Sequence, residues 1–396
     1  MKKFVIPVIL LVIFGITIFW LGDSGSESAK EQEPPDGSSR LAELLGSDDN
    51  EAYSKAVGPR TFHFPADHGP HPDFRNEWWY LTGNLDGEQG QRFGFELTFF
   101  RFSLSPGAAQ HGEKQARSNW RTDQVYIAHF AVTDKSKEQF HVAQRFSRGA
   151  LGLAGAQSEP FVVWTEDWSV REVRSDDEEP SGTVRWELTA SDPGFALHLY
   201  LTGEKRAVLN GIDGLSQKSS RPGNASYYYS ISRLRSEGTL HTAGRDHKVS
   251  GLSWLDREWS SSALDDEQQG WDWFALQLSD GSDLMFYSIR RNDGSQDPHS
   301  AGTWISREGE ARHLSRDEVE IVVTREWESP EGGTYPSGWE IRVPGIDLAL
   351  EVKPLIDNQE LFTTVRYWEG AVNVTGQKDD QPLEGRGYVE LTGYAR

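Results

Sequence analysis

The chain has 396 residues and a formal net charge of −21, which argues against a nucleic-acid-binding protein or adhesion to an anionic membrane surface, since both need clustered basic side chains. It contains no cysteine, so a disulfide framework, a thiolate metal site and a cysteine nucleophile are excluded. Aromatic residues make up 12% of the chain, including 15 tryptophans, and supply enough apolar surface for the cores of two domains.

The first residues predict export. Two lysines precede an uncharged, mostly apolar run from Phe4 to Leu21, and a run of this kind is typical of a secretory signal or of a membrane-spanning helix of ~20 residues. We expect residues 1–22 to be an apolar helix that acts as a signal anchor, or alternatively a cleaved signal peptide. The remaining chain is then periplasmic or otherwise extracytoplasmic, and contacts the membrane through this segment only. Residues 23–60 are rich in Ser, Gly, Pro and acidic residues, which predicts a disordered linker.

From about residue 61 onward, short runs alternate apolar and polar residues between Gly, Asp, Asn or Pro, as in RFGFELTFFRF (92–102). This pattern predicts an all-β sandwich or barrel. WWYLTGNLDGEQGQRFGFELTFFR (78–101) resembles WDWFALQLSDGSDLMFYSIR (271–290), which predicts two related antiparallel barrels in tandem. We place them at 61–240 and 241–396, because the sequence near 236–251 is rich in turn residues. Barrels of this kind can hold one hydrophobic ligand.

The stretch SGLSWLDREWSS (250–261) sets three consecutive charged residues between two tryptophans. In a regular strand Trp254, Asp256 and Glu258 share one face, and Arg257 lies on the other. Confinement and mutual repulsion would raise the pKa of one of the two carboxyls, as a general acid near neutral pH requires. The alternative is structural: Arg257 pairs with Asp256 or Glu258, since buried charges are usually paired.

Further candidates flank the two repeats. Carboxylates and tryptophans that lie side by side are expected to contact a ligand: Glu77, Trp78, Asp272 and Trp273. Arg101 and Arg290 occupy matching places, and we expect each to stack on a tryptophan and close its own barrel. Asp272 has a second interpretation, as the partner of an arginine.

Cofactor and metal motifs are missing from the sequence. Histidines in FHFPADHGPHPD (62–73) match no metal-ligand spacing, and there is no phosphate-binding glycine loop or dinucleotide fingerprint. We therefore expect neither a metal nor an organic cofactor. The hydrolase motifs G-x-S-x-G and H-E-x-x-H are missing as well.

Six stretches resemble the AttH family, the lipocalin-like family that includes bacterial carotenoid 1,2-hydratase (CrtC) and many predicted secreted hydrolases. They are NEWWYLTGNL (76–85), FGFELTFFR (93–101), SGLSWLDREWSS (250–261), GWDWFALQL (270–278), RYWEGAV (366–372) and GRGYVELTGY (385–394). The resemblance extends from about His63 to Tyr394. It implies two tandem lipocalin-like, calycin-type β-barrels.

The resemblance also implies site residues. Trp254-Leu255-Asp256 is similar to the aromatic-x-Asp of the hydratases, whose Asp is implicated as the proton donor, so Asp256 is the implied catalytic residue. The His-x-Trp pair of the hydratases falls on Tyr227 and Tyr229, which departs from their pattern. These two tyrosines are either ligand contacts or ordinary strand packing.

Two functions remain open. AttH-type members often accompany genes of ABC-type membrane transporters, which implies an exported protein that binds a lipid or isoprenoid as a transporter accessory. The hydratases add water to an acyclic carotenoid without a cofactor. They imply instead a hydratase or isomerase of an isoprenoid or polyene, with Asp256 as the general acid.

Overall fold

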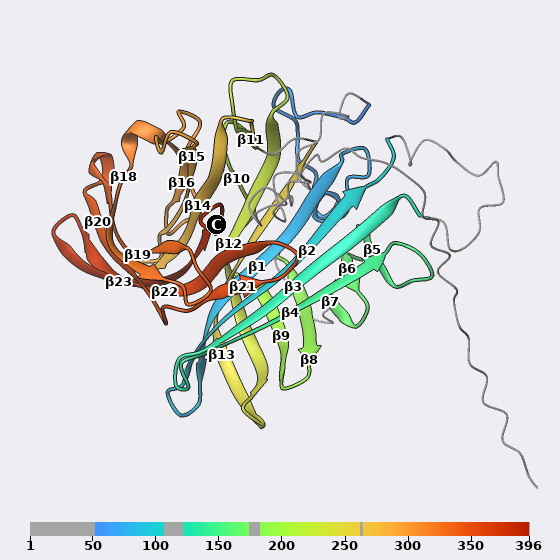
Figure 1. Ribbon diagram of the computed structural model, residues 1–396, viewed down its shortest axis with the longest axis horizontal. Helices are drawn as coiled ribbons and strands as arrows, with labels where there is room; N and C mark the ends of the chain where they lie inside the picture. The colour runs from blue at the N-terminus through green and yellow to red at the C-terminus, as the bar shows by residue number, and fades with distance from the viewer. Residues whose placement is uncertain (1–51, 107–121, 174–182, 262–263, 396) are drawn as a thin grey trace, which may run out of the picture. The chain divides into compact units, whose positions relative to one another are not determined.

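The structure, a computed structural model, describes residues 52–106, 122–173, 183–261 and 264–395. Almost every regular element in this part of the chain is a β-strand, and the strands form two antiparallel sheets (Figure 1). The predicted all-β fold is therefore confirmed. No helix among the described residues is long and apolar enough to cross a membrane. The apolar segment 4–21 and most of the acidic linker lie outside those residues.

The first sheet has thirteen strands in the order β4-β3-β2-β1-β13-β12-β9-β8-β7-β6-β5, with β10 and β11 paired to β12. Their bounds are β1 Asn76–Gly87, β2 Arg92–Ser103, β3 Gln124–Asp134, β4 Gln139–Arg148, β5 Ala154–Gln157, β6 Val162–Thr165, β7 Trp168–Glu172, β8 Arg185–Asp192, β9 Phe195–Gly203, β10 Val208–Leu209, β11 Leu215–Gln217, β12 Ala225–Thr242 and β13 Arg245–Ser260.

The second sheet has ten strands in the order β17-β16-β15-β14-β23-β22-β20-β19-β18, with β21 paired to β22. Their bounds are β14 Gln268–Leu278, β15 Asp283–Arg291, β16 Ala301–Ile305, β17 Ala311–Ser315, β18 Glu320–Glu328, β19 Thr334–Val343, β20 Leu348–Pro354, β21 Glu360–Phe362, β22 Arg366–Lys378 and β23 Gln381–Leu391. Three short 3-10 turns complete the described elements: η1 Ala66–His68, η2 Arg316–Glu318 and η3 Pro344–Ile346.

The chain passes from the first sheet to the second at a later residue than the sequence suggested. The turn-rich stretch is the tip of one long hairpin, in which Ala243 and Gly244 have φ of 51° and 71°, as a two-residue hairpin turn requires. Both arms of the hairpin, β12 and β13, belong to the first sheet. The boundary predicted at 240–241 is therefore wrong, and the second sheet begins only with β14.

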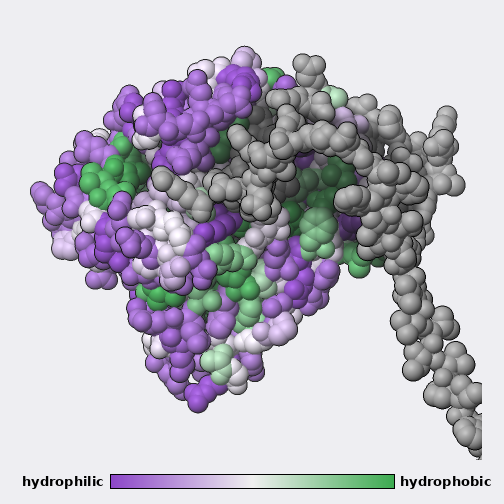
Figure 2. Space-filling model, in the orientation of Figure 1, coloured by the Kyte–Doolittle hydropathy of each residue, from purple (hydrophilic) through white to green (hydrophobic). Residues whose placement is uncertain are grey.

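Each sheet curls around its own apolar core. Phe95, Phe99 and Trp259 lie in the core of the first sheet, and Phe274 and Trp339 lie in that of the second. One sheet is a nearly closed barrel and the other a half-barrel (Figure 1), which agrees with the tandem lipocalin-like barrels expected. Figure 2 shows a mostly hydrophilic surface on this face, with hydrophobic residues in separate patches.

The two sheets also pack against each other. Because side chains alternate along a strand, β1, β2 and β13 turn one face to their own core and the other to the second sheet. The inter-sheet layer includes Tyr80 and Trp254 from the first sheet. Its backbones approach closely at Gly94, where a Cβ would lie 2.5 Å from the Cβ of Ala371. The Asn84 amide donates across the layer to the Gly387 carbonyl (2.9 Å).

The repeated hairpins occupy corresponding places. Trp78 of β1 and Trp273 of β14 both face the inter-sheet region, whereas the next residues, Trp79 and Phe274, lie in their own cores. Glu77-Trp78-Trp79 therefore corresponds to the segment 272–274.

Candidate functional site

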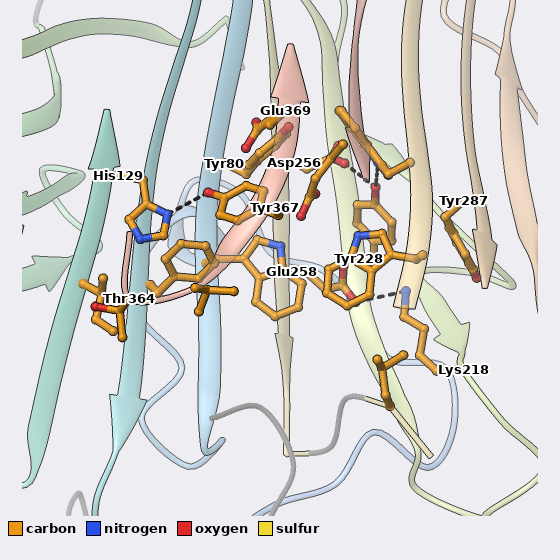
Figure 3. A pocket seen from close by; sticks show the side chains of 18 of the residues that line it. Tyr80, His129, Lys218, Tyr228, Asp256, Glu258, Tyr287, Thr364, Tyr367 and Glu369 are labelled. Atoms are coloured by element: carbon orange, nitrogen blue, oxygen red, sulfur yellow. Dashed lines mark hydrogen bonds and ion pairs between the residues drawn. The ribbon is translucent and has the colours of Figure 1, made fainter. Parts of the chain in front are cut away.

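A cavity of about 130 Å³ lies between the two sheets (Figure 3). The sequence had suggested a ligand inside a barrel, but both barrel interiors are occupied by the two cores. The outward faces of both sheets contribute the lining: Trp78, Tyr80, Phe100, Phe102, Ile127, His129, Gln144, Lys218, Tyr228, Asp256, Glu258, Leu264, Trp271, Trp273, Tyr287, Ile289, Thr364, Val365, Tyr367, Glu369 and Glu390.

Aromatic side chains dominate both walls of the cavity. Trp78 and Phe100 come from the first sheet, and Trp271 and Trp273 from the second. Trp78, Phe100 and Trp271 are only partly buried, and Thr364 is exposed, so these residues form the rim. Walls of this kind suit an apolar small molecule, with a few polar groups to orient it.

Asp256 lies in this cavity because β13 is a regular strand through its C-terminal half, with the predicted alternation of faces. Trp254, Asp256 and Glu258 all turn toward the second sheet. Oδ1 of Asp256 accepts hydrogen bonds from the Ser230 hydroxyl (2.5 Å) and the Trp254 indole N–H (2.6 Å). Oδ2 accepts one from the Tyr228 hydroxyl. The carboxyl is therefore held rigidly at the wall.

The environment of Asp256 poises it for proton transfer. Burial raises its pKa to about 6, and the three hydrogen bonds to its oxygens oppose a larger rise. Repulsion from Glu258, which the sequence suggested as one cause, is the smaller contribution. Near neutral pH the carboxyl therefore populates both its protonated and its ionised form, as general acid–base catalysis requires.

Glu258 has a cationic partner that the sequence did not indicate. Nζ of Lys218, in the loop before β12, lies 3.1 Å from Oε1 of Glu258 and 4.2 Å from the centroid of the Tyr287 ring. Arg257 forms its ion pair with neither Glu258 nor Asp256. The alternative interpretation, in which the charge triplet pairs within itself, is therefore wrong. Strand alternation explains this, since Arg257 points into the first barrel.

The partner of Arg257 is Glu77, at the end of the first barrel. Glu77 is fully buried and accepts hydrogen bonds from both Arg101 and Arg257. Burial alone would raise the pKa of Glu77, but the two guanidinium groups outweigh it and hold the pKa well below its usual range. Arg257 also stacks on Trp79, 3.9 Å from the ring centroid. Glu77 therefore does not line the cavity, contrary to expectation, because it shares the inward face with Trp79.

The second barrel has a similar closure. Arg290 donates to Asp272 and to the Thr392 carbonyl. It stacks on Tyr394, 3.7 Å from the ring centroid, where the sequence had suggested a tryptophan. Burial raises the pKa of Asp272, and Arg290 and the Tyr394 hydroxyl oppose the rise. Asp272 is thus the partner of an arginine and does not line the cavity, whereas its neighbour Trp273 does.

The two tyrosines carried over from the hydratase pattern lie in the first barrel. The Tyr227 hydroxyl donates to the Gly58 carbonyl (2.9 Å), and the Tyr229 hydroxyl lies 2.6 Å from Nδ1 of His68. Their neighbours Tyr228 and Ser230 contact Asp256 instead. The pairing of β12 with β13 sets Tyr228 opposite Glu258 and Ser230 opposite Asp256, so the hairpin register would have identified them.

Several polar groups of the site were not singled out from the sequence. Glu369 and Glu390 line the cavity from the second sheet, inside the segments RYWEGAV and GRGYVELTGY. Nδ1 of His129 lies 2.7 Å from the Tyr367 hydroxyl (Figure 3), and burial lowers the pKa of His129 to about 3. Among the described residues no cluster of three or more His, Asp or Glu side chains is arranged to hold a metal ion.

Comparison with known proteins identifies the family. The AttH-like family model matches residues 55–394. The crystal structure of an AttH-type protein from Nitrosomonas europaea is similar, with 35% identity over 86% of this chain and 100% of that chain, and a TM-score of 0.74. Kievitone hydratase from Nectria haematococca shares the fold at 15% identity, over 86% of this chain and 95% of that chain, with a TM-score of 0.61. No curated protein matches in sequence. The chain therefore belongs to the AttH-like family.

Proposed function

We propose that this protein is a cofactor-free hydratase of a hydrophobic, isoprenoid-type small molecule, with Asp256 as the general acid. The observation that carries the proposal is a buried carboxyl with a pKa of about 6 on the wall of an aromatic-lined cavity. The fold shared with a protein named a hydratase supports the reaction class. Water addition to an alkene needs only a proton donor, a water molecule and stabilisation of a cation, all of which side chains can provide.

In the proposed reaction, protonated Asp256 gives its proton to one carbon of a trisubstituted double bond. The two electrons of the π bond form the new C–H bond and leave a tertiary cation on the other carbon. A water molecule adds to this cation, and the resulting oxonium returns one proton to the Asp256 carboxylate. The net change is the addition of one water, and the enzyme ends in its starting state.

The neighbours of Asp256 suit both halves of this cycle. Once the proton has left, the carboxylate accepts hydrogen bonds from Ser230, Tyr228 and Trp254, so the charge does not stand alone in an apolar site. The Trp273 indole N–H donates to the Tyr228 hydroxyl (3.1 Å), which fixes the orientation of that hydroxyl toward Asp256. Aromatic faces on both walls stabilise a nearby cation.

The second candidate is binding without reaction, as an accessory to an ABC-type transporter. The aromatic lining of the cavity favours it, because a lipid or isoprenoid would be bound whether or not it reacts. Export, with attachment through the apolar segment 4–21, is a proposal common to both functions.

The test offers acyclic isoprenoids with a terminal trisubstituted double bond to the purified protein in isotopically labelled water. Mass spectrometry then detects products that have gained one labelled water. We expect turnover by the parent and a loss of at least ~100-fold in Asp256→Asn, because general acid catalysis contributes about that factor or more. Equal rates for the two proteins would rule out Asp256 as the acid. Tight binding without any product would favour the transporter accessory.

A further inference from the structure

Three carboxyls that the proposed reaction does not use face the inter-sheet layer, and we call them the carboxyl wall: Glu96 on β2, Glu369 on β22 and Glu390 on β23. Glu369 and Glu390 are directly opposite each other in the β22–β23 pairing, and both line the cavity. Two like charges at such a position destabilise a sheet. The arrangement therefore needs a reason other than stability.

Among the described residues, no cationic side chain pairs with the carboxyl wall. Glu369 is 1% exposed, and the groups that favour its ionised form are the hydroxyls of Tyr80 and Tyr367, not a cation. Glu96 is completely buried, and the group that favours its ionised form is Thr98, which is uncharged. Figure 3 shows Glu369 beside Tyr80 and near Asp256 in the cavity. Buried charges in proteins are usually paired, so carboxyls at a cavity that no cation compensates suit a ligand that brings the positive charge.

Charge around the cavity is unbalanced. Its lining holds four carboxyls, Asp256, Glu258, Glu369 and Glu390, and Lys218 is the one lysine or arginine among them. Lys218 pairs with Glu258. The titratable groups that act on the carboxyl wall from the packed strands are Tyr80 of β1, Asp256 and Glu258 of β13, Tyr367 of β22 and Tyr388 of β23. None of them is a cation.

The site can tolerate this imbalance by keeping protons on the carboxyl wall. Burial, with repulsion from neighbouring carboxylates, raises the pKa of Glu390 to about 8 and those of Glu96 and Glu369 well above their usual range. A ligand that carried a positive charge would change the balance, because it would favour the ionised form of a nearby carboxyl.

We infer that the carboxyl wall recognises a positively charged group, so that the cavity selects an organic cation, an ammonium carried on an isoprenoid-sized apolar chain, over its neutral analogue. Glu369 and Glu390 supply the countercharge, and Trp78, Trp271 and Trp273 supply aromatic faces that attract a cation. The inference rests on the proposed function for the size and apolar character of the ligand. The same countercharge would favour the tertiary cation formed when Asp256 protonates an alkene.

Binding of such a cation is linked to proton release. At about pH 7 a wall carboxyl must lose its proton to pair with the ammonium, so about one proton should leave for each ligand bound. Affinity for the cation should therefore rise with pH, and should level off once the pH exceeds the pKa that the carboxyl has in the ligand-free protein. Affinity for a neutral ligand should not depend on pH in this way.

Calorimetric titration with three probes of one chain length tests the inference: geranyltrimethylammonium, geraniol and geranic acid. We expect the ammonium to bind at least about tenfold more tightly than geraniol, and the geranic acid anion to bind most weakly. Titrations in buffers of different ionisation enthalpy should show release of about one proton for the ammonium and none for geraniol.

Two variants assign the selectivity to the wall. Glu369→Gln and Glu390→Gln keep the shape of a protonated carboxyl but cannot ionise, so both are expected to fold. Each should weaken ammonium binding by at least about tenfold and change geraniol binding by less than about twofold. Glu351→Gln, on the half-exposed side of β20, is the matched control and should change neither affinity.

The outcomes separate this inference from the proposed function. Geraniol binding as tightly as the ammonium, or unchanged selectivity in both glutamine variants, would overturn the cation inference and leave the hydratase proposal intact. If none of the three probes binds the parent, the isoprenoid-type ligand class itself is contradicted, and the cation inference with it. If one variant does not fold, the other variant and the selectivity of the parent still decide.

Discussion

Substitution of Glu77 by glutamine should strongly destabilise the protein without changing any residue that lines the cavity. In the described part of the chain, Glu77 is the one carboxylate between Arg101 and Arg257, and the three side chains are at most 1% exposed. Its oxygens also accept the backbone N–H of His71 at 3.0 and 3.1 Å. In Glu77→Gln the shape is kept, but two buried guanidinium groups lose their countercharge.

The expected loss is about 3–5 kcal/mol in the free energy of unfolding, the cost of removing one partner from a buried ion pair. The pH dependence has a definite sign. Because the folded-state pKa of Glu77 is depressed, its stabilisation is fully present above the unfolded-state value of about 4.3, and is lost as pH falls through the folded-state pKa. The variant should therefore lose less stability than the parent on acidification.

Urea denaturation at neutral pH, followed by tryptophan fluorescence, measures the loss. Glu351→Gln removes a carboxylate from the half-exposed pair with Lys353, and should change the free energy of unfolding by no more than about 0.5 kcal/mol. A loss below about 1 kcal/mol in Glu77→Gln would refute the view that this carboxylate holds the end of the first barrel together.

Three further predictions follow from the contacts described. Tyr228→Phe removes a donor from the Asp256 carboxylate, so the pKa of Asp256 should rise and the pH profile of turnover should shift upward; an unshifted profile would contradict this role. Tyr229→Phe removes the hydroxyl that contacts His68, and should cost about 1 kcal/mol in urea denaturation with no change in ligand affinity by calorimetry. The folded-state pKa of Glu390 is about 8, so the folded protein keeps a proton that the unfolded chain releases. As pH rises from about 4.5 to 8, the free energy of unfolding of the parent should fall by up to about 1.4 kcal/mol per pH unit, and Glu390→Gln should lack this slope.

Strand alternation made much of this molecule predictable. The charge triplet at 256–258 divides between two faces as expected, and this alone separates Asp256 and Glu258 from Arg257. The same rule, applied with the register of the β12–β13 hairpin, would have selected Tyr228 and Ser230. The residue-by-residue carry-over from the hydratase pattern reached Tyr227 and Tyr229 instead, one position off, and so on the opposite face.

The place of the cavity could not be predicted from periodicity. Strands buried on both faces read as nearly continuous apolar runs, and a sequence does not show which face meets its own barrel and which meets another sheet. Glu77 and Glu258 illustrate the difficulty. Each is a buried carboxylate next to tryptophans, yet the first pairs with arginines inside a barrel and the second lines the cavity.

The pH dependence of water addition by the parent protein tests the central claim most directly. If protonated Asp256 is the acid, the rate should be constant below about pH 6, where burial places its pKa, and fall by about tenfold for each pH unit above it. Asp256→Asn should remove this dependence together with the activity. A rate that stays level or rises through pH 6 would contradict the assignment of Asp256 as the proton donor.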